Sequence, residues 1–220
     1  VRKTDDKIDI TSKYSQYAFA NVWYYSALLG FKTQFLPGYT FQGDTARTLV
    51  SDFLAPAYTI LAIGLDYRPN KKFSLFVAPL TGKITYVGNQ QLADQGAFGV
   101  KAAEYDTAGI RLVPGENIRY EFGGYLRAQY QAEIMTNVNL KARLELFTNY
   151  LDRPENIDVN AETLITMKVN KFITASLASQ VIYDHDVNIE VDQNRDGVID
   201  GKGPRLQFRQ VLGVGFGVKF

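Results

Sequence analysis

Residues Arg205–Phe220 read RLQFRQVLGVGFGVKF, and this stretch decides the fold. Successive side chains of a β-strand point to opposite faces, so alternate residues share a face. Apart from Gln210, one face is wholly apolar: Leu206, Phe208, Leu212, Val214, Phe216, Val218 and Phe220. Apart from Val211, the other face is charged, polar or glycine: Arg205, Gln207, Arg209, Gly213, Gly215, Gly217 and Lys219. Soluble sheets rarely end on such a long two-faced strand, because its edge promotes aggregation. We therefore expect a membrane barrel strand.

The most regular alternation in the chain lies in residues 118–134, where Ile118, Tyr120 and Phe122 begin an apolar row and Arg119 and Glu121 a polar one. An ordinary soluble strand has about 5 to 6 residues. A tilted membrane strand needs about 9 to 11, so this segment is long enough to cross a bilayer. Residues 138–150 repeat the pattern after three residues, which predicts a hairpin.

Nine strands are predicted in this way, at residues 5–17, 21–35, 57–68, 72–87, 116–134, 138–151, 159–170, 172–184 and 205–220. Short turns alternate with long loops between them, which is the layout of outer-membrane barrels, with the turns periplasmic and the loops extracellular. We therefore predict an all-β fold, an antiparallel transmembrane β-barrel of outer-membrane type, forming one domain over residues 1–220. The alternative is a large soluble barrel.

The outward aromatic residues provide a separate test of this orientation. The periplasmic rim would hold Trp23, Tyr25, Tyr67, Phe73, Tyr130 and Phe220. The outer rim would hold Phe31, Phe35, Tyr120, Phe122, Tyr150 and Tyr183. Between these rims the outward residues are mainly aliphatic. Two aromatic rims around an aliphatic band match the two interfaces of a bilayer.

Composition narrows the possible functions. The chain has 24 Lys and Arg against 23 Asp and Glu, and this near-neutral balance gives no support for nucleic-acid binding. It has no Cys, which excludes disulfides and thiolate chemistry and is consistent with a protein outside the cytoplasm. No apolar stretch of about 18 residues is present, so a transmembrane helix is not expected.

The odd number of strands has a consequence for the closure of the barrel. If Phe220 is periplasmic, Val1 lies at the outer rim, whereas single-chain bacterial barrels have an even number of strands. Unpaired backbone groups are costly in hydrocarbon. We therefore expect either that an odd number of strands precedes Val1 or that a partner supplies the closing edge.

Several short segments carry a resemblance to a known family. They are KTDDK at 3–7, SKY at 12–14, WYYS at 23–26, QFLPGY at 34–39, SDFLAP at 51–56, PLTGK at 79–83, FGV at 98–100 and QF at 207–208. In these segments the chain resembles an uncharacterised family of Bacteroidetes outer-membrane proteins, defined only as a domain of unknown function. Family members carry upstream strands with an Asn-Trp and Gly-rich segment. The resemblance thus implies an N-terminally truncated barrel of about twelve strands, and it implies no reaction.

A calcium site is predicted in the last long loop. Oxygen ligands recur there at the spacing of a Ca²⁺ loop, with Gly197 at its sharp turn. The predicted ligands are Asp192, Asn194, Asp196, the carbonyl of Val198, and Asp200. The bidentate Glu is replaced by Gly203 and the flanks are strands, so the site would be weak or completed by Asp186, Glu190 or another loop. The alternative is a polar turn rich in Asp, Asn and Gly.

Charged residues on the polar faces are predicted to line the lumen. They are Arg119, Glu121, Arg127, Glu133, Lys141, Arg143, Glu145, Lys168, Arg205 and Arg209, to which Glu162 is added. Opposite charges on adjacent strands pair with each other. For about twelve strands this favours a narrow or plugged lumen over an open pore. No group has one dominant sign, so neither anion nor cation selectivity is predicted.

Two functions are consistent with these patterns. The first is a non-enzymatic barrel in contact with outer-membrane lipid, which admits small polar solutes or serves in an envelope complex with protein partners. The second is a Ca²⁺-dependent surface enzyme acting on lipid or lipopolysaccharide. His185, the only His, and Ser179, the nearest outward Ser, are about 20 Å apart along a strand and cannot form a catalytic pair. A Ser on a neighbouring strand would be needed, so we expect no enzyme.

Overall fold

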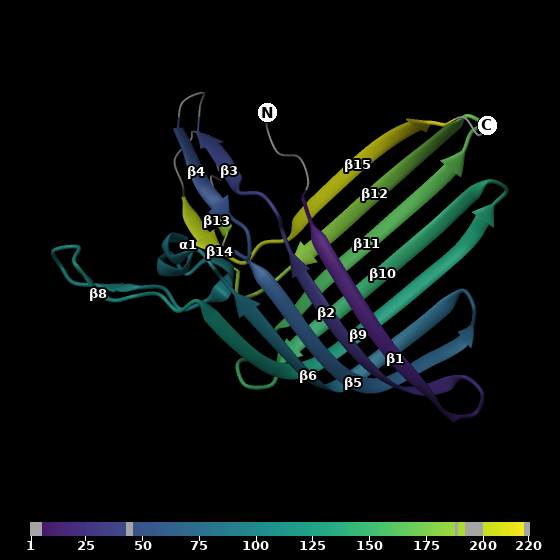
Figure 1. Ribbon diagram of the computed structural model, residues 1–220, viewed down its shortest axis with the longest axis horizontal. Helices are drawn as coiled ribbons and strands as arrows, with labels where there is room; N and C mark the ends of the chain where they lie inside the picture. The colour runs from purple at the N-terminus through teal and green to yellow at the C-terminus, as the bar shows by residue number, and fades with distance from the viewer. Residues whose placement is uncertain (1–5, 43–45, 188, 192–199, 218–220) are drawn as a thin grey trace.

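A computed structural model describes residues 6–42, 46–187, 189–191 and 200–217, and one antiparallel sheet dominates it (Figure 1). Its nine strands follow the order β1-β2-β5-β6-β9-β10-β11-β12-β15. Their bounds are β1 Ile8–Phe19, β2 Trp23–Thr33, β5 Ala57–Asn70, β6 Phe73–Tyr86, β9 Ile118–Met135, β10 Val138–Asn149, β11 Ile157–Lys168, β12 Ile173–Tyr183 and β15 Gln207–Phe216. The all-β antiparallel prediction and the nine strands are confirmed. Phe220, on which the orientation of the strands was based, lies outside the described residues.

The sheet has two free edges. Strand β1 pairs with β2 alone, and β15 pairs with β12 alone, among the described residues. The four connections 20–22, 71–72, 136–137 and 169–172 are tight hairpin turns, and they lie at one end of the sheet, here called the turn end (Figure 1). The longer connections lie at the opposite end, the loop end.

The sheet curls until its two halves face each other. In Figure 1, β1, β2 and β5 run at a steep angle to β10, β11, β12 and β15. We call β1, β2, β5 and β6 the front wall, and β9, β10, β11, β12 and β15 the back wall. The Nζ of Lys32 on β2 lies 3.0 Å from Oε2 of Glu145 on β10, which places these walls within side-chain reach. The face between the walls is the inner face, and the other is the outer face.

Two glycines allow neighbouring strands to approach closely where the sheet bends. A Cβ atom at Gly64 would lie 2.0 Å from the carbonyl oxygen of Val77, beside a register shift between β5 and β6. A Cβ atom at Gly123 would lie 1.8 Å from the carbonyl oxygen of Thr148 on β10. Since no side chain fits at either position, the backbones come together there and the strands bend.

A small apolar core lies on the inner face rather than between two sheets. Buried side chains from both walls meet there, and this inner cluster consists of Leu28, Ala62, Phe76, Ala78, Tyr125 and Phe147. The rings of Phe76 and Tyr125 meet edge to face at 6.3 Å, a favoured aromatic geometry. The interior is therefore partly filled.

The loop end has structure of its own. Its elements are the hairpin of β3 (Gly38–Gln42) and β4 (Ala46–Ser51), helix α1 (Gln90–Asp94), the 3₁₀ turn η1 (Ala97–Gly99), the hairpin of β7 (Glu104–Tyr105) and β8 (Arg111–Val113), and the pair β13 (Ile189–Val191) and β14 (Gly201–Gly203). A second buried cluster, of Ala55, Val87, Leu92, Ala93 and Val100, holds α1 against these loops. The described helices are only a few residues long, and neither has the length or apolarity of a membrane span.

Candidate functional site

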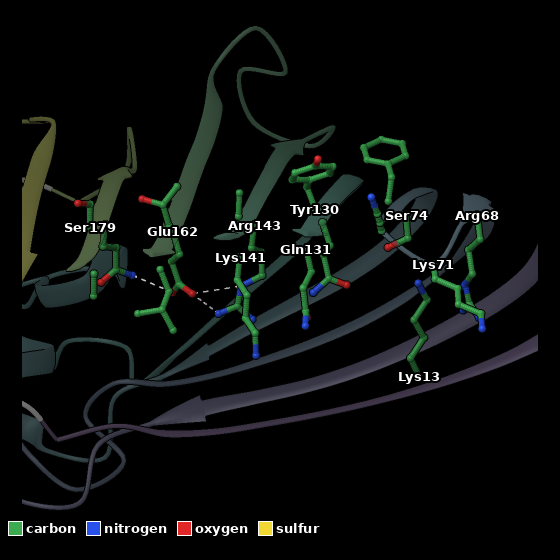
Figure 2. A pocket seen from close by; sticks show the side chains of 18 of the residues that line it. Lys13, Arg68, Lys71, Ser74, Tyr130, Gln131, Lys141, Arg143, Glu162 and Ser179 are labelled. Carbon is green, nitrogen blue, oxygen red and sulfur yellow. Dashed lines mark hydrogen bonds and ion pairs between the residues drawn. The ribbon is translucent and has the colours of Figure 1, made fainter. Parts of the chain in front are cut away.

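A basic cavity occupies the turn end of the inner face, between the two walls. Its volume is about 750 Å³. Eight basic residues line it, and they are Lys7, Lys13, Arg68, Lys71, Lys72, Lys141, Arg143 and Arg209. Glu162 is the one acidic residue among its described lining. Figure 2 shows Lys13, Arg68 and Lys71 on one side of the cavity, and Lys141 and Arg143 on the other. Coulomb repulsion between such cations is relieved only by countercharge.

The buried carboxylate of Asp66 supplies part of that countercharge. Asp66 lies on β5 with its side chain fully buried. Its Oδ2 accepts from Nζ of Lys13 at 2.7 Å and pairs with the guanidinium of Arg68. The ammonium of Lys13 also lies 4.6 Å from the ring centroid of Phe76, and Arg68 covers the ring of Tyr24. One carboxylate thus holds two cations in place and leaves one positive charge in excess.

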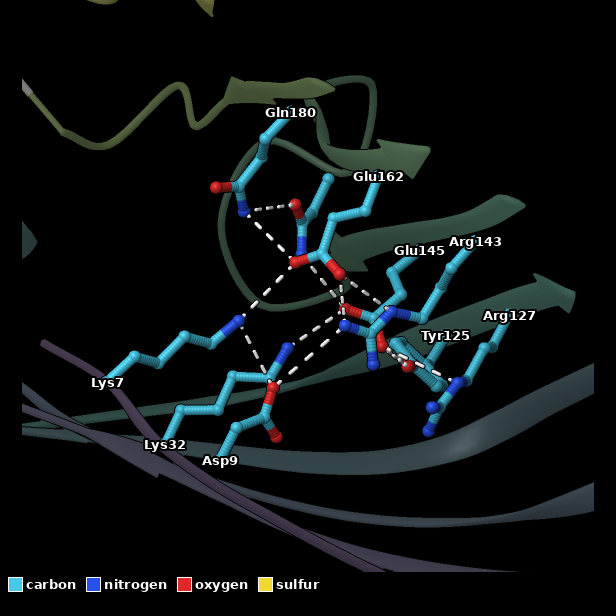
Figure 3. A network of polar contacts seen from close by, with 10 residues as sticks. Lys7, Asp9, Lys32, Tyr125, Arg127, Arg143, Glu145, Glu162 and Gln180 are labelled. Carbon is cyan, nitrogen blue, oxygen red and sulfur yellow. Dashed lines mark hydrogen bonds and ion pairs between the residues drawn. The ribbon is translucent and has the colours of Figure 1, made fainter. Parts of the chain in front are cut away.

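A network of ion pairs and hydrogen bonds joins the two walls, and we call it the cross-wall network (Figure 3). Its charged members are Lys7, Asp9, Lys32, Arg127, Arg143, Glu145 and Glu162. Glu145 is its centre, because its carboxylate accepts from Lys32 at 3.0 Å, from the Tyr125 hydroxyl at 2.9 Å and from the Asn160 amide at 3.1 Å. Arg127 lies 3.6 Å from the same carboxylate. In this region positive and negative groups alternate and pair with one another, and, among the described residues, Arg127 Nε is held by charge attraction without a hydrogen bond.

A second bridge of the network is centred on Glu162. Glu162 pairs with Arg143 on the neighbouring strand, and it also pairs with Lys7, next to β1, at 3.4 Å. Asp9 lies 4.0 Å from Arg143. Together these contacts join the first strand to the back wall through side chains.

Three carboxylates gather at the loop end of the inner face, and we call them the rim cluster. Oxygen atoms of Asp158, Asp184 and Asp186 lie within 4.8 Å of one another. Burial raises the pKa of Asp184. The cluster offers the hard oxygen donors that Ca²⁺ takes. However, Lys83 already lies 3.0 Å from Asp158, and Arg119 pairs with Asp186, so two of the carboxylates are neutralised by the protein itself.

The residues predicted to line the lumen lie in several places. Arg127, Arg143 and Glu145 belong to the cross-wall network, Arg119 and Glu121 pair below the rim cluster at 3.0 Å, and Lys141 and Arg209 line the basic cavity. Glu133 and Lys168 lie near the turns, where Glu133 accepts from the backbone N–H of Asn137. Arg205 is exposed just before β15.

The predicted calcium ligands Asp192, Asn194, Asp196 and Val198 lie outside the described residues. Asp200 is described and comes directly before β14. The calcium site therefore stays a prediction. His185, considered for a hydrolase, lies with Nδ1 3.3 Å from the Tyr183 hydroxyl, and its backbone N–H donates to Asp158. These two contacts fix His185 next to the rim cluster.

The basic cavity was missed in the sequence. Lys13 and Arg68 stand on different strands and are 55 positions apart, and only the curl of the sheet brings either of them opposite Lys141. The view that no group of lining charges has a dominant sign is therefore wrong for the turn end. The alternation within residues 8–19 does place Lys13 on the polar face. The face of Lys13 could therefore be predicted from the sequence, but the residues around it in the cavity could not.

Comparison with known proteins adds one finding. Residues 1–39 match the model of a family described as Protein of unknown function (DUF3078). No curated protein matches the chain. No solved structure matches it either. The matched part includes β1 and β2, and the description names neither a location nor an activity.

Proposed function

We propose that the chain is the major part of a transmembrane β-barrel of the bacterial outer membrane, a non-enzymatic barrel that acts as a narrow pore for small polar solutes or as a structural element of an envelope complex. One observation carries the proposal: the outer face is apolar and exposed, while the inner face is polar and paired with itself. A soluble barrel would show the reverse arrangement.

The outer face lacks any protein cover over long stretches. Leu29 on β2 is 51% exposed, Leu61 on β5 is 53% exposed, and Leu212 on β15 is 71% exposed. The register places Leu29 beside Leu61, so these side chains form a continuous surface across neighbouring strands. A soluble monomer rarely exposes apolar patches larger than a few hundred Å². A lipid bilayer is the environment in which this surface is stable.

Aromatic contacts occur at both ends of the outer face, which also favours a bilayer. At the turn end, Trp23 lies 4.8 Å from Tyr67, and Phe172 lies 6.0 Å from Phe216, measured between ring centroids. At the loop end, Phe122 lies 6.1 Å from Tyr150. Aromatic side chains concentrate at the two interfaces of membrane barrels.

The free edges fit a barrel that is completed by further strands. On the open edges of β1 and β15 no neighbouring strand is present among the described residues, and each unpaired backbone group is costly in hydrocarbon. We propose that additional strands, from a longer chain or from a partner subunit, pair with these edges. The loop end would then face outward and the turn end the periplasm.

The filled interior supports a narrow passage rather than a wide one. The inner cluster and the cross-wall network both lie between the walls, so a solute must pass beside Phe147 and the Lys32–Glu145 pair. Conductance of the full-length protein in planar bilayers should therefore show small steps, well below those of an open porin.

The absence of Cys makes a direct test of the two faces possible. Single substitutions Leu61→Cys and Leu212→Cys should resist a water-soluble maleimide in proteoliposomes and react with a lipid-soluble one. Lys101→Cys in the loops, and Lys141→Cys on the inner face, are the matched water-exposed controls. If Leu61→Cys and Leu212→Cys react with the water-soluble reagent as fast as these controls, the outer face is not in lipid and the proposal fails.

A further inference from the structure

We propose that the basic cavity at the turn end binds a soluble organic anion that carries two or more phosphate or carboxylate charges. The inference rests on the proposed function only in placing this cavity at the periplasmic mouth. The binding chemistry itself follows from the cavity, and it holds whether the barrel conducts or serves as a structural element.

The charges of the cavity are not balanced from within. Glu162, Asp9 and the buried Asp66 engage four of the basic groups, which are Lys7, Lys13, Arg68 and Arg143. Lys71, Lys72 and Lys141 have no ion-pair partner among the described residues. These three lysines come from the β5–β6 turn and from β10, so they approach the cavity from opposite walls. A multivalent anion between them would relieve a repulsion that the protein leaves in place.

Part of the site is already held in position. Lys13 and Arg68 are fixed by Asp66, and Arg68 also donates to the Ser15 hydroxyl at 2.6 Å. Fixed cations lose little side-chain entropy on binding, which raises affinity compared with mobile surface lysines. The planar fork of a guanidinium matches two oxygen atoms of a carboxylate or phosphate.

Size and neutral donors favour an organic anion over a simple ion. About 750 Å³ lies within the range of small-molecule sites, and it is far larger than a single phosphate needs. Gln129, Gln131 and Ser74 line the cavity between the two basic sides, where amides and a hydroxyl can hydrogen-bond the uncharged part of a ligand. Figure 2 shows Gln131 between these sides.

The acidic residues elsewhere on the inner face would repel an anion in the cavity only weakly. The carboxylates of the rim cluster lie at the opposite end, beyond the inner cluster and Glu145. Their repulsion is screened over a Debye length of about 8 Å at physiological salt. An anion that enters from the turn end therefore meets the positive groups first.

Calorimetry of the full-length protein in neutral detergent at low salt tests the inference, with pyrophosphate and citrate as probes and chloride as the monovalent reference. We expect both probes to bind and chloride not to compete at equal concentration. Lys71→Gln and Lys141→Gln should each weaken pyrophosphate binding roughly tenfold, because a hydrogen bond to a charged group contributes about that much. Lys171→Gln is the matched control, since it removes the same charge at the same end outside the cavity lining, and it should change affinity little.

The outcomes separate this inference from the proposed function. If the maleimide test succeeds and pyrophosphate does not bind, the anion site is wrong and the barrel stands. If Leu61→Cys proves water-exposed while pyrophosphate binds and Lys141→Gln weakens it, the site stands without the membrane assignment. If Lys141→Gln and Lys171→Gln weaken pyrophosphate binding equally, the anion is attracted only by the overall positive charge of this end, and the proposed site is wrong. Heat-dependent gel mobility of each variant shows that it remains folded, and Lys71, exposed in a turn, is the substitution least able to disturb folding.

Discussion

The basic cavity and the cross-wall network lie on the same inner face and are built from the same kinds of residue, yet they behave in opposite ways. In the network, Glu145 accepts from three side chains of both walls, so its oxygen atoms are fully engaged and the walls are joined. In the cavity, Asp66 engages two cations, and Lys71 and Lys141 find no acid among the described residues. The role of a lysine inside a curled sheet is thus decided by the acids that the fold brings within its reach, not by its own strand.

The largest effect should come from the apolar inner cluster, which lies on the same face as these two regions. Phe76→Ala removes a fully buried ring between Tyr125 and Lys13 and should cost about 4 kcal/mol of the free energy of unfolding. Denaturant unfolding in detergent, followed by emission of the single Trp23, measures it. Phe208→Ala, on the exposed outer face, is the control and should cost much less. Similar losses in both would show that the ring does not hold the interior.

Removal of the buried acid at the turn end comes next. Asp66→Asn leaves Lys13 and Arg68 without countercharge and should destabilise the protein by about 3 kcal/mol, since breaking a buried pair leaves an uncompensated charge. The same unfolding experiment applies. Asp152→Asn breaks an exposed pair with Arg153 and should cost less than about 0.5 kcal/mol. A result for Asp66→Asn as small as this control would mean that the cations of the cavity do not need Asp66.

A somewhat smaller effect is expected at the centre of the network. Glu145→Gln keeps the shape of the side chain and loses the charge that faces Lys32 and Arg127, which should cost about 2 kcal/mol. Because this pair joins the walls, single-channel conductance should also rise. Glu133→Gln, at the turn end, alters neither contact and is the control. Unchanged conductance in Glu145→Gln would show that the network does not narrow the passage.

The smallest effect concerns the loops at the loop end, outside the nine-stranded sheet. The side chain of Gln90, the backbone N–H of Gly115 and the guanidinium of Arg111 lower the pKa of Asp94. A lowered folded-state pKa means that this carboxylate contributes stability above its ordinary pKa and loses it as the pH falls through the lowered value. Proteolysis of the segment 104–113 should therefore quicken below about pH 4 in the native chain. Asp94→Asn should show a smaller pH dependence, and Glu104→Gln an unchanged one.

Most of the sheet could be predicted from the sequence because alternation is a local property. Leu212 and Val214 mark the outer face of their strand from their spacing alone, and the same rule places Arg127 and Glu145 on the inner face. The pairing of Arg127 with Glu145 also follows, since their strands are joined by a hairpin.

Contacts across the interior could not be predicted in this way. Lys32 and Glu145 meet only because the sheet bends near Gly64 and Gly123, and the extent of that bend is not encoded in any single strand. The rim cluster has a different origin, because Asp158 lies at the start of β11 and Asp184 and Asp186 follow β12, its partner in a hairpin. The structured loops were missed because α1 and the short hairpins carry too few residues for a periodic pattern.

The edge strand β1 is held by its backbone ladder to β2 and, on the inner face, by its side chains. Lys13 reaches Asp66, Asp9 approaches Arg143, and the adjoining Lys7 reaches Glu162, so the strand is tied to two walls while one backbone edge stays open. Such an edge is a rigid template. When a further strand docks on this edge, β1 is already ordered. The conformational entropy of fixing β1 was lost when the rest of the sheet folded. The rate at which a further strand closes the sheet would then depend on the ordering of the incoming strand alone.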